Sequence, residues 1–283
     1  MRGLIRTLKF YFLLALAGLM AVLFLATPEG RRYAAKLERY VDRMEHRLFY
    51  RSGRPLRGTP DLKRFDARLV EKGVKQGSPV FIRIFKQESE LELWLHNGRR
   101  FVLFATYPMC YWSGNLGAKL KEGDRQSPEG FYTVAASQLN PNSSWHRSFN
   151  LGFPNSYDRS HGRTGSFLMV HGGCASIGCY AMTNAVVDEI WQLITAALKN
   201  GQPRFSVHAF PFRMSEHNME WYADKRWKTF WSDLKRGYDM FERTKVPPVI
   251  ATCNRRYLVS AGRPGSKGED QVLQQCKKAL TKR

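Results

Sequence analysis

Residues 170–180 read Val170-His171-Gly172-Gly173-Cys174-Ala175-Ser176-Ile177-Gly178-Cys179-Tyr180, which places a histidine, two thiols and three glycines within a short stretch. An apolar run of strand length, Ser166-Phe167-Leu168-Met169-Val170, comes before it. After it, apolar residues recur at helical spacing between a capping residue, Thr183 or Asn184, and Gly201. We therefore expect a strand that ends at His171, a tight loop, and a helix that begins a few residues after Cys179.

The residue types in this stretch indicate cysteine acyl-transfer chemistry. A thiol acts as a nucleophile only as the thiolate, which a nearby base favours. His171 can be that base if the loop folds back on itself, and Gly172, Gly173 and Gly178 permit this. Backbone amides at Gly178 and Cys179 would then face a developing oxyanion, because glycine lets a carbonyl approach closely. The alternative interpretation is a buried structural histidine with inert core thiols.

The length and charge of the chain limit its class and its partners. With 283 residues it has room for one large domain or two small ones. Its net charge of +21 indicates a partner rich in anionic groups (a cell-wall polymer, lipid headgroups or nucleic acid) or a general basic bias of the surface. The sequence has no zinc-finger spacing, RNA-binding signature or phosphate-cradling loop. We therefore expect no nucleic-acid partner.

The five cysteines (Cys110, Cys174, Cys179, Cys253 and Cys276) are too scattered for a disulfide framework, and their odd number leaves at least one free thiol. Two pairings are compatible with an oxidising compartment: Cys253 with Cys276, and Cys174 with Cys179. Cys174 can also be a redox partner of Cys179 or a small packed residue. The sequence leaves these alternatives open.

An unbroken apolar run, Phe10–Ala26, follows three basic residues near the start of the chain. Its length is at the short limit for a membrane-spanning helix and exceeds most signal-peptide cores. We expect residues 1–26 to be an uncleaved signal anchor, an N-terminal transmembrane helix with the cytoplasm on its N-terminal side. A cleaved signal peptide is the alternative, and both interpretations export the rest of the chain.

Residues 27–78 are predicted to be a basic stalk and a linker. From 29 to 49 the pattern is polar, basic and compatible with a helix. One face of this helix carries an apolar stripe made of Tyr33, Leu37, Tyr40, Met44 and Leu48. The basic face either contacts anionic lipid headgroups or is solvated. Residues 51–60 have the Gly and Pro content of a linker, and a short helix over Pro60–Lys72 leads into the main domain.

Residues 79–213 carry the patterns of a β-rich catalytic domain. Strands are predicted at 80–85, 91–95, 100–105, from 130, and at 204–210. Residues 137–165 show little periodicity and many Asn, Ser, Gly and His, which predicts a long functional loop.

Residues 214–262 are predicted to be a helical C-terminal extension packed on this domain. Aromatic residues recur at helical spacing between 215 and 244 and indicate a packing face, and 249–259 should be extended. Residues 263–283 form a basic tail with a short helix around Gln271–Leu280.

Several linked motifs carry a resemblance to a known family. His171-Gly172 and the run Ser176-Ile177-Gly178-Cys179-Tyr180-Ala181-Met182-Thr183 match a His-Gly and a Ser-x-Gly-Cys signature. Supporting matches are Gly123-Asp124, Ser127-Pro128-Glu129-Gly130-Phe131-Tyr132, Asn150-Leu151-Gly152-Phe153-Pro154-Asn155, Tyr157-Asp158-Arg159, His161-Gly162, Tyr238-Asp239 and Phe241-Glu242. Over about residues 80–260 the chain resembles the L,D-transpeptidase (YkuD-type) catalytic domain, and specifically its YafK-like branch.

The resemblance implies a mixed, β-rich α+β fold, a YkuD-like β-sandwich or barrel with flanking helices, that carries a cysteine active site. It implies a single-pass inner-membrane protein with its catalytic domain in the periplasm, acting on peptidoglycan stem peptides through a thioester. The outcome would be an L,D-transpeptidase cross-link or a YafK-like amidase cleavage that releases an envelope lipoprotein from peptidoglycan, so that lipoprotein is an expected partner. No cofactor is expected.

The resemblance also assigns roles to residues. Cys179 takes the nucleophile role and His171 the base role, the Gly172 carbonyl orients the imidazole, and the amides of Gly178 and Cys179 are the oxyanion donors. Residues expected to bind substrate are His161, Arg159, Tyr180 and Ser176. The broader family has Arg or Asn at the position of Ala181 and a longer spacing between its histidine and cysteine.

Three alternatives remain. His161 is a second candidate for the base. A zinc site could use His171, Cys174 and Cys179 with His161 or His208, although the spacing matches no usual pair of chelating hairpins. A protein without activity, tethered to the membrane and binding peptidoglycan, is the alternative from a non-enzyme class.

Overall fold

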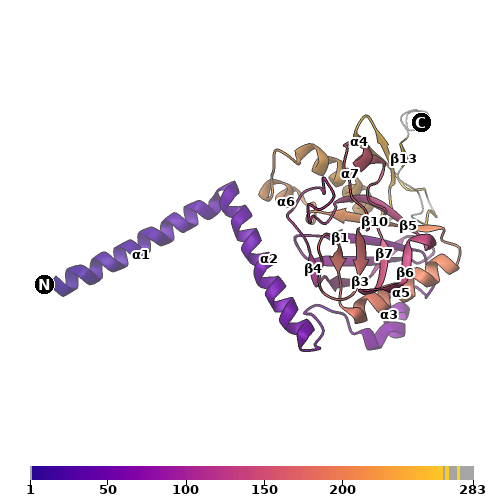
Figure 1. Cartoon of the computed structure of the whole chain (residues 1–283), viewed down its shortest axis with the longest axis horizontal. Helices are drawn as coiled ribbons and strands as arrows, with labels where there is room; N and C mark the ends of the chain where they lie inside the picture. Colours follow the sequence, from indigo (N-terminus) through magenta and orange to yellow (C-terminus); the bar gives the residue numbers. More distant parts are fainter. Residues whose placement is uncertain (1, 264, 268–272, 275–283) are drawn as a thin grey trace.

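The computed structural model describes residues 2–263, 265–267 and 273–274. They form a mixed α+β fold of two five-stranded sheets, a three-stranded sheet and flanking helices, which confirms the predicted class at this level (Figure 1). The strands are β1 (Val80–Phe85), β2 (Glu90–His96), β3 (Phe101–Pro108), β4 (Tyr111–Trp112), β5 (Gly130–Ala135), β6 (Leu139–Ser143), β7 (His146–Asn150), β8 (Met169–His171), β9 (Tyr180–Ala181), β10 (Arg204–Phe210), β11 (Val249–Cys253), β12 (Arg256–Ser260) and β13 (Leu273–Gln274). The helices are α1 (Arg2–Ala26), α2 (Pro28–Arg51), α3 (Phe65–Glu71), α4 (Ser156–Ser160), α5 (Asn184–Lys199), α6 (Glu216–Trp221) and α7 (Lys228–Thr244), with 3-10 turns η1 (Leu62–Arg64) and η2 (Ala136–Gln138).

The first sheet has the strand order β3-β2-β1-β10-β5 and contains the five strands predicted from the sequence. Every residue of β1, and every residue of β10 after the first, is buried. Since successive side chains on a strand point to opposite sides, both faces of these strands are covered. Ile82 and Val207 lie in a core shared with the second sheet and α5, whereas Phe85 and Phe210 pack in another cluster with residues of α7. This sheet is therefore covered on both sides, which explains its near-continuous apolar strands.

The second sheet, of order β4-β9-β8-β7-β6, corrects one prediction. Residues 137–165, predicted to be a long loop, contain β6, β7 and α4. The alternation of apolar and polar residues that marks a strand is missing from β6, which reads Leu-Asn-Pro-Asn-Ser and is largely exposed. β6 lies at the edge of the sheet, where a strand tolerates proline. The predicted strand at 166–170 is shorter than expected and begins at Met169.

The helix after the cysteine loop forms as predicted. Thr183 is its N-cap, and the Thr183 hydroxyl accepts a hydrogen bond from the Val186 N–H. The apolar side chains spaced along α5 are buried against the main core. Because the cap fixes where α5 begins, it also fixes the end of the cysteine loop.

The C-terminal extension consists of α6, α7 and the β11–β12 hairpin. The aromatic residues of α7 pack in the core, as predicted. The extended segment at 249–259 is folded into two strands, because Asn254 and Arg255 both have positive φ. In the predicted helix at 271–280, only Leu273 and Gln274 are described; they form β13, so the helix prediction is wrong there, and its other residues lie outside the described part of the chain.

The N-terminal region consists of two helices that meet at a sharp bend (Figure 1). Among the described residues no single helix is long and apolar enough to cross a membrane, whereas the bent pair Phe10–Ala26 and Glu29–Arg51, with 95° between its members, meets the requirement of length and composition together. The predicted transmembrane helix thus stays a prediction.

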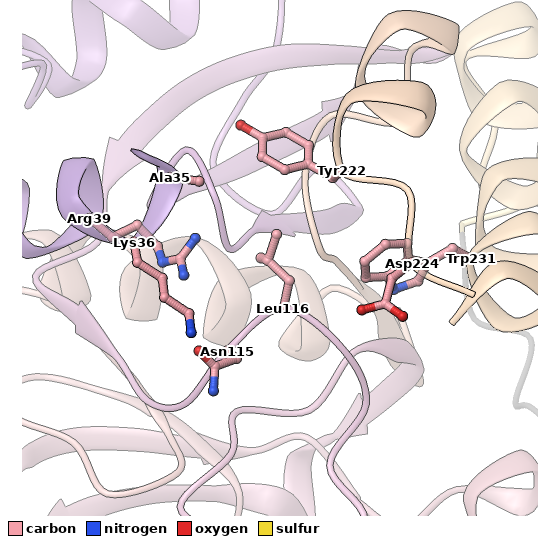
Figure 2. Close-up of a pocket in the computed structure, with 8 residues that line it drawn as sticks. All are labelled: Ala35, Lys36, Arg39, Asn115, Leu116, Tyr222, Asp224 and Trp231. Carbon is pink, nitrogen blue, oxygen red and sulfur yellow. The ribbon is translucent and has the colours of Figure 1, made fainter. Parts of the chain in front are cut away.

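The stalk helix is present as α2, but one of its faces docks on the domain. Arg39 Nη1 donates to Gln87 Oε1 at 2.5 Å, and Arg43 Nη2 donates to the Trp112 carbonyl at 2.8 Å. A cavity of about 210 Å³ lies at this junction. Figure 2 shows Lys36 and Arg39 of α2 among its lining residues, with the Lys36 side chain directed toward Asn115. Burial lowers the pKa of the Arg39 guanidinium to about 10. The helix is therefore part of the folded unit.

Candidate active site

Two adjacent strands bring Cys179 and His171 to one face of the second sheet. β8 and β9 pair in parallel, with Val170 opposite Tyr180 and His171 opposite Ala181. Extending this register by one residue sets Cys179 beside Met169, and the Met169 N–H donates to Cys179 Sγ at 3.4 Å. Side chains alternate along a strand, so those of Cys179 and His171 project from the same face as diagonal neighbours.

Both side chains line one cleft of about 480 Å³. Its walls combine polar residues of the β6–β7 hairpin with exposed apolar side chains from three loops. The lining residues are Asn140, Ser143, Ser144, Trp145, Ser148, Phe167, Met169, His171, Ala175, Ser176, Ile177 and Cys179. The thiol and the imidazole therefore border the same space.

The imidazole of His171 is held in one tautomer. Its Nδ1 lies 2.5 Å from the Gly172 carbonyl oxygen. A carbonyl can only accept, so Nδ1 carries the proton and Nε2 keeps a free lone pair. Burial lowers the pKa of His171 below its usual range, and the bond to Gly172 opposes this in part. At neutral pH His171 is therefore a neutral imidazole that can accept a proton at Nε2.

Cys179 is the free thiol among the described cysteines. Burial raises the pKa of Cys179, while the Met169 N–H and the positive charge of Lys119 oppose the rise. The Cys179 Sγ donates to the Phe167 carbonyl at 3.6 Å, and in the described chain no hydrogen bond joins it to His171. The resting pair is therefore a thiol and a neutral imidazole, and the proton must move as the sulfur attacks.

Serine hydroxyls hold the backbone around the thiol. The Gly178 N–H donates to Ser113 Oγ at 2.9 Å, and the Cys179 N–H donates to Ser176 Oγ at 2.7 Å. The hydroxyls of Ser127 and Ser176 each donate to the Cys179 carbonyl at 2.8 Å. Both amides expected to be oxyanion donors are thus engaged by serines in this structure. A substrate oxyanion would have to replace Ser113 and Ser176 as their acceptor.

The glycine after the His-Gly pair is needed for packing. Gly173 has φ of +87°, and its N–H donates to Asn184 Oδ1 at 2.9 Å. A Cβ at Gly173 would lie 2.7 Å from Cε3 of Trp145, whose ring is 5.9 Å from the His171 ring. Trp145 therefore covers the loop beside the base, and a larger residue at 173 would displace it.

One of the two expected cysteine pairings is wrong. Cys174 is bonded to Cys110, so its pairing with Cys179 and its role as a redox partner of Cys179 are wrong, whereas it is buried in a small cluster, as expected of a packed residue. Cys253 is also disulfide-bonded, while Cys276 lies outside the described residues. The zinc alternative fails because the Cys174 sulfur is not available. Among the residues that the structure describes, no group of three or more His, Cys, Asp or Glu could hold a metal ion.

Of the four residues expected to bind substrate, the structure brings only Ser176 to the cleft. Tyr180 is fully buried, and its hydroxyl donates to the Pro128 carbonyl, so its side chain cannot touch a bound substrate. His161 bonds the Arg255 carbonyl, and Arg159 lines a different cavity. His161 is therefore not positioned to act as the base for Cys179.

Sequence reasoning missed several residues around the thiol. The Ser113 hydroxyl reaches the Gly178 N–H and the Ser127 hydroxyl reaches the Cys179 carbonyl, each from more than 50 residues away. Ser127 lies in one of the motifs that resemble the family, but nothing in the sequence marks its bond to Cys179, and nothing local marks Ser113. Trp145, Phe167 and Ile177 line the cleft with exposed apolar side chains. Trp145, a large aromatic residue within the polar segment 137–165, was the one feature of the sequence that could have indicated a cleft wall.

Comparisons with known proteins indicate the family of this chain. A family model described as the L,D-transpeptidase catalytic domain (YkuD) matches residues 79–226. The protein named "Putative L,D-transpeptidase YafK" in two Escherichia coli strains is 50% identical over 194 residues, covering 68% of this chain and 79% of that protein.

Two solved structures are also similar. The helical cell shape determining protein Pgp2 from Campylobacter jejuni aligns with 64% of this chain and 65% of its own, with a TM-score of 0.38 and 18% identity. Bd1075 of Bdellovibrio bacteriovorus aligns with 64% of this chain and 79% of its own, with a TM-score of 0.37 and 18% identity.

Proposed function

The chain belongs to the L,D-transpeptidase family, and from this premise we propose that it is an envelope enzyme that acts on peptidoglycan stem peptides through a thioester at Cys179. The products would be a cross-link, if an amine accepts the acyl group, or a cleaved amide, if water does. Release of a lipoprotein from peptidoglycan is the amidase form of the same reaction.

One observation carries the proposal: the free thiol of Cys179 and the neutral imidazole of His171 line one open cleft on a common sheet face. An inert structural pair would be packed among apolar side chains, whereas this pair borders a cleft with serine and exposed apolar walls. The observation therefore favours an enzyme over a protein that only binds peptidoglycan.

The reaction would proceed in two balanced steps. His171 Nε2 takes the thiol proton as the Cys179 sulfur bonds the carbonyl carbon; the C–N bond then breaks, and the leaving amine receives that proton. In the second step, the nitrogen of an acceptor amine or the oxygen of a water molecule attacks the thioester carbon, and His171 Nε2 takes the proton that this atom loses. The C–S bond breaks and the thiol recovers its proton.

The proposed location is the outer side of the inner membrane. The apolar run Phe10–Ala26 in α1, preceded by basic residues, is the feature that supports a single-pass anchor, with the catalytic domain in the periplasm. The Cys110–Cys174 disulfide supports export, because structural disulfides form and persist in oxidising compartments.

The test is mass spectrometry of purified peptidoglycan after incubation with the full chain. We expect release of D-alanine, new cross-links or a freed lipoprotein remnant, and their loss in Cys179→Ala and His171→Ala. His161→Ala is the matched control, because this histidine lies outside the cleft, and it should retain activity. A Cys179→Ala variant as active as the parent would refute the nucleophile. A parent that binds peptidoglycan and changes none of these products would favour the binding protein.

A further inference from the structure

The second helix carries an apolar stripe that is largely exposed along its whole length. Six side chains on α2 are apolar or aromatic and between 44% and 67% exposed: Tyr33, Leu37, Tyr40, Val41, Met44 and Leu48. Their spacing of three and four residues sets them along one side of the helix. A stripe of this length is unusual on a helix that faces only water.

The opposite side of α2 is the side that docks on the catalytic domain. Ala35 and Arg39 are buried, and the Arg43 guanidinium lies over the Tyr111 and Trp112 rings at 4.6 and 5.1 Å. At 3.6 residues per turn, these positions are about half a turn from the stripe. The stripe therefore points directly away from the domain.

The first helix leaves the molecule on the same side as the stripe. The centres of the Phe24 ring of α1 and the Tyr33 ring of α2 lie 6.5 Å apart. The backbone of α1 also comes close to α2, because a Cβ at Gly30 would lie only 1.9 Å from the Phe24 carbonyl oxygen. Gly30 and Tyr33 lie on the stripe side of α2 by helical spacing. The axes of the two helices differ by 95°, and Figure 1 shows α1 projecting away from the domain. A bilayer that holds α1 upright would lie parallel to α2 and meet its stripe.

The charges of α2 fit a surface of anionic lipid. The helix has seven lysine and arginine residues and four acidic ones. Arg51 is exposed on the stripe side by helical spacing. Lys36 and Arg47 border the stripe on the edge nearer the domain, where the Arg47 guanidinium lies 5.7 Å from the centre of the Tyr111 ring, and Glu45, on the other edge, is paired with Arg57 at 3.3 Å. Tyrosines at the apolar boundary and cations beside it are typical of helices that lie in the membrane interface.

We propose that α2 is an interfacial helix whose stripe lies in the outer leaflet of an anionic phospholipid membrane and holds the catalytic domain against that surface. The proposal rests on the anchor proposed above for α1. A second copy of the chain is the rival occupant, but it would have to fit between the stripe and the bilayer that holds α1. Lipid needs no such space, because the stripe and α1 face the same medium.

The test is spin labelling of the full chain in vesicles of phosphatidylethanolamine and phosphatidylglycerol. Single cysteines are introduced as Leu37→Cys, Met44→Cys and Leu48→Cys in a Cys179→Ala background, so that the label has one target. Glu38→Cys is the matched control, because Glu38 is exposed outside the stripe. We expect labels on the stripe to be several-fold more accessible to oxygen than to a water-soluble nickel chelate, at a depth of about 5–10 Å below the headgroups, and the label at 38 to show the reverse.

A label at Leu16→Cys separates this proposal from the anchor. If it reports hydrocarbon while the stripe labels report water, the interfacial helix is refuted and the anchor stands. Spin–spin broadening at the stripe positions would assign the stripe to a second copy and also refute the proposal. If the label at 16 reports water, the anchor fails, and the stripe labels still decide the position of α2. Neutral phosphatidylcholine vesicles should give shallower stripe labels, because the attraction of the basic residues is lost.

Discussion

Removing the Cys110–Cys174 disulfide should destabilise the protein strongly. The bond joins residues 64 apart in sequence, so it closes a long loop of the unfolded chain. Chain-entropy estimates for a loop of this length give about 4 kcal/mol of stabilisation. Both sulfurs lie in a small cluster with Leu56, and this cluster connects the end of α2 to the loop that carries Cys179. We therefore expect the double variant Cys110→Ala/Cys174→Ala to lose about 4 kcal/mol of its free energy of unfolding.

The assay is urea unfolding followed by tryptophan fluorescence and circular dichroism. At an m value of about 3 kcal/mol/M, the midpoint should fall by about 1.3 M. The substitutions must be made in the gene, because a reducing agent would also open the disulfide of Cys253. Cys179→Ala removes a thiol without a cross-link and should leave the midpoint nearly unchanged. A double variant that unfolds at the parent's urea concentration would refute the reasoning from loop closure.

Three further predictions concern buried histidines and a glycine. Burial lowers the pKa of His208 to about 3, so between pH 6.5 and pH 3 the unfolded state binds a proton that the folded state does not. His208 alone should therefore lower the free energy of unfolding by about 2.5 kcal/mol between pH 7 and pH 4.5, and the fall measured in His208→Leu should be smaller than the parent's by that amount. Burial also lowers the pKa of His171, and this base must be neutral to accept a proton. The value of kcat/KM should therefore rise with pH through a midpoint below 6.5. A midpoint at or above 6.5 would contradict a buried, neutral imidazole at His171. Gly173→Ala should reduce kcat/KM much more than Gly162→Ala does. Both glycines have positive φ, so alanine costs about 1–2 kcal/mol of backbone strain at either position, but only a Cβ at 173 would press against Trp145. Equal losses of kcat/KM in the two variants would show that the contact with Trp145 is irrelevant.

The sequence predicted the features that are local. The strand that ends at His171, the cap at Thr183 and the five strands of the first sheet all depend on residues within a few positions of one another. The features it did not predict join distant segments: Ser113 with Gly178, Cys110 with Cys174, and α2 with the domain. A hydroxyl or a thiol has many compatible partners in a chain of this length, and only the packed fold selects one.

The short spacing between His171 and Cys179 has a topological reason. Parallel neighbours such as β8 and β9 are usually joined by a crossover of about a dozen residues or more, yet here the chain returns to the start of the next strand within residues 172–179. So tight a return needs backbone in the left-handed region, and Gly173, Cys174 and Gly178 all have positive φ. From the sequence, Gly173 and Gly178 are expected to let the loop fold back, and Gly178 to let a substrate carbonyl approach. The strand register shows that these residues are needed first for the fold. Without the tight return β9 could not pair with β8, and the thiol of Cys179 would not project beside the imidazole of His171.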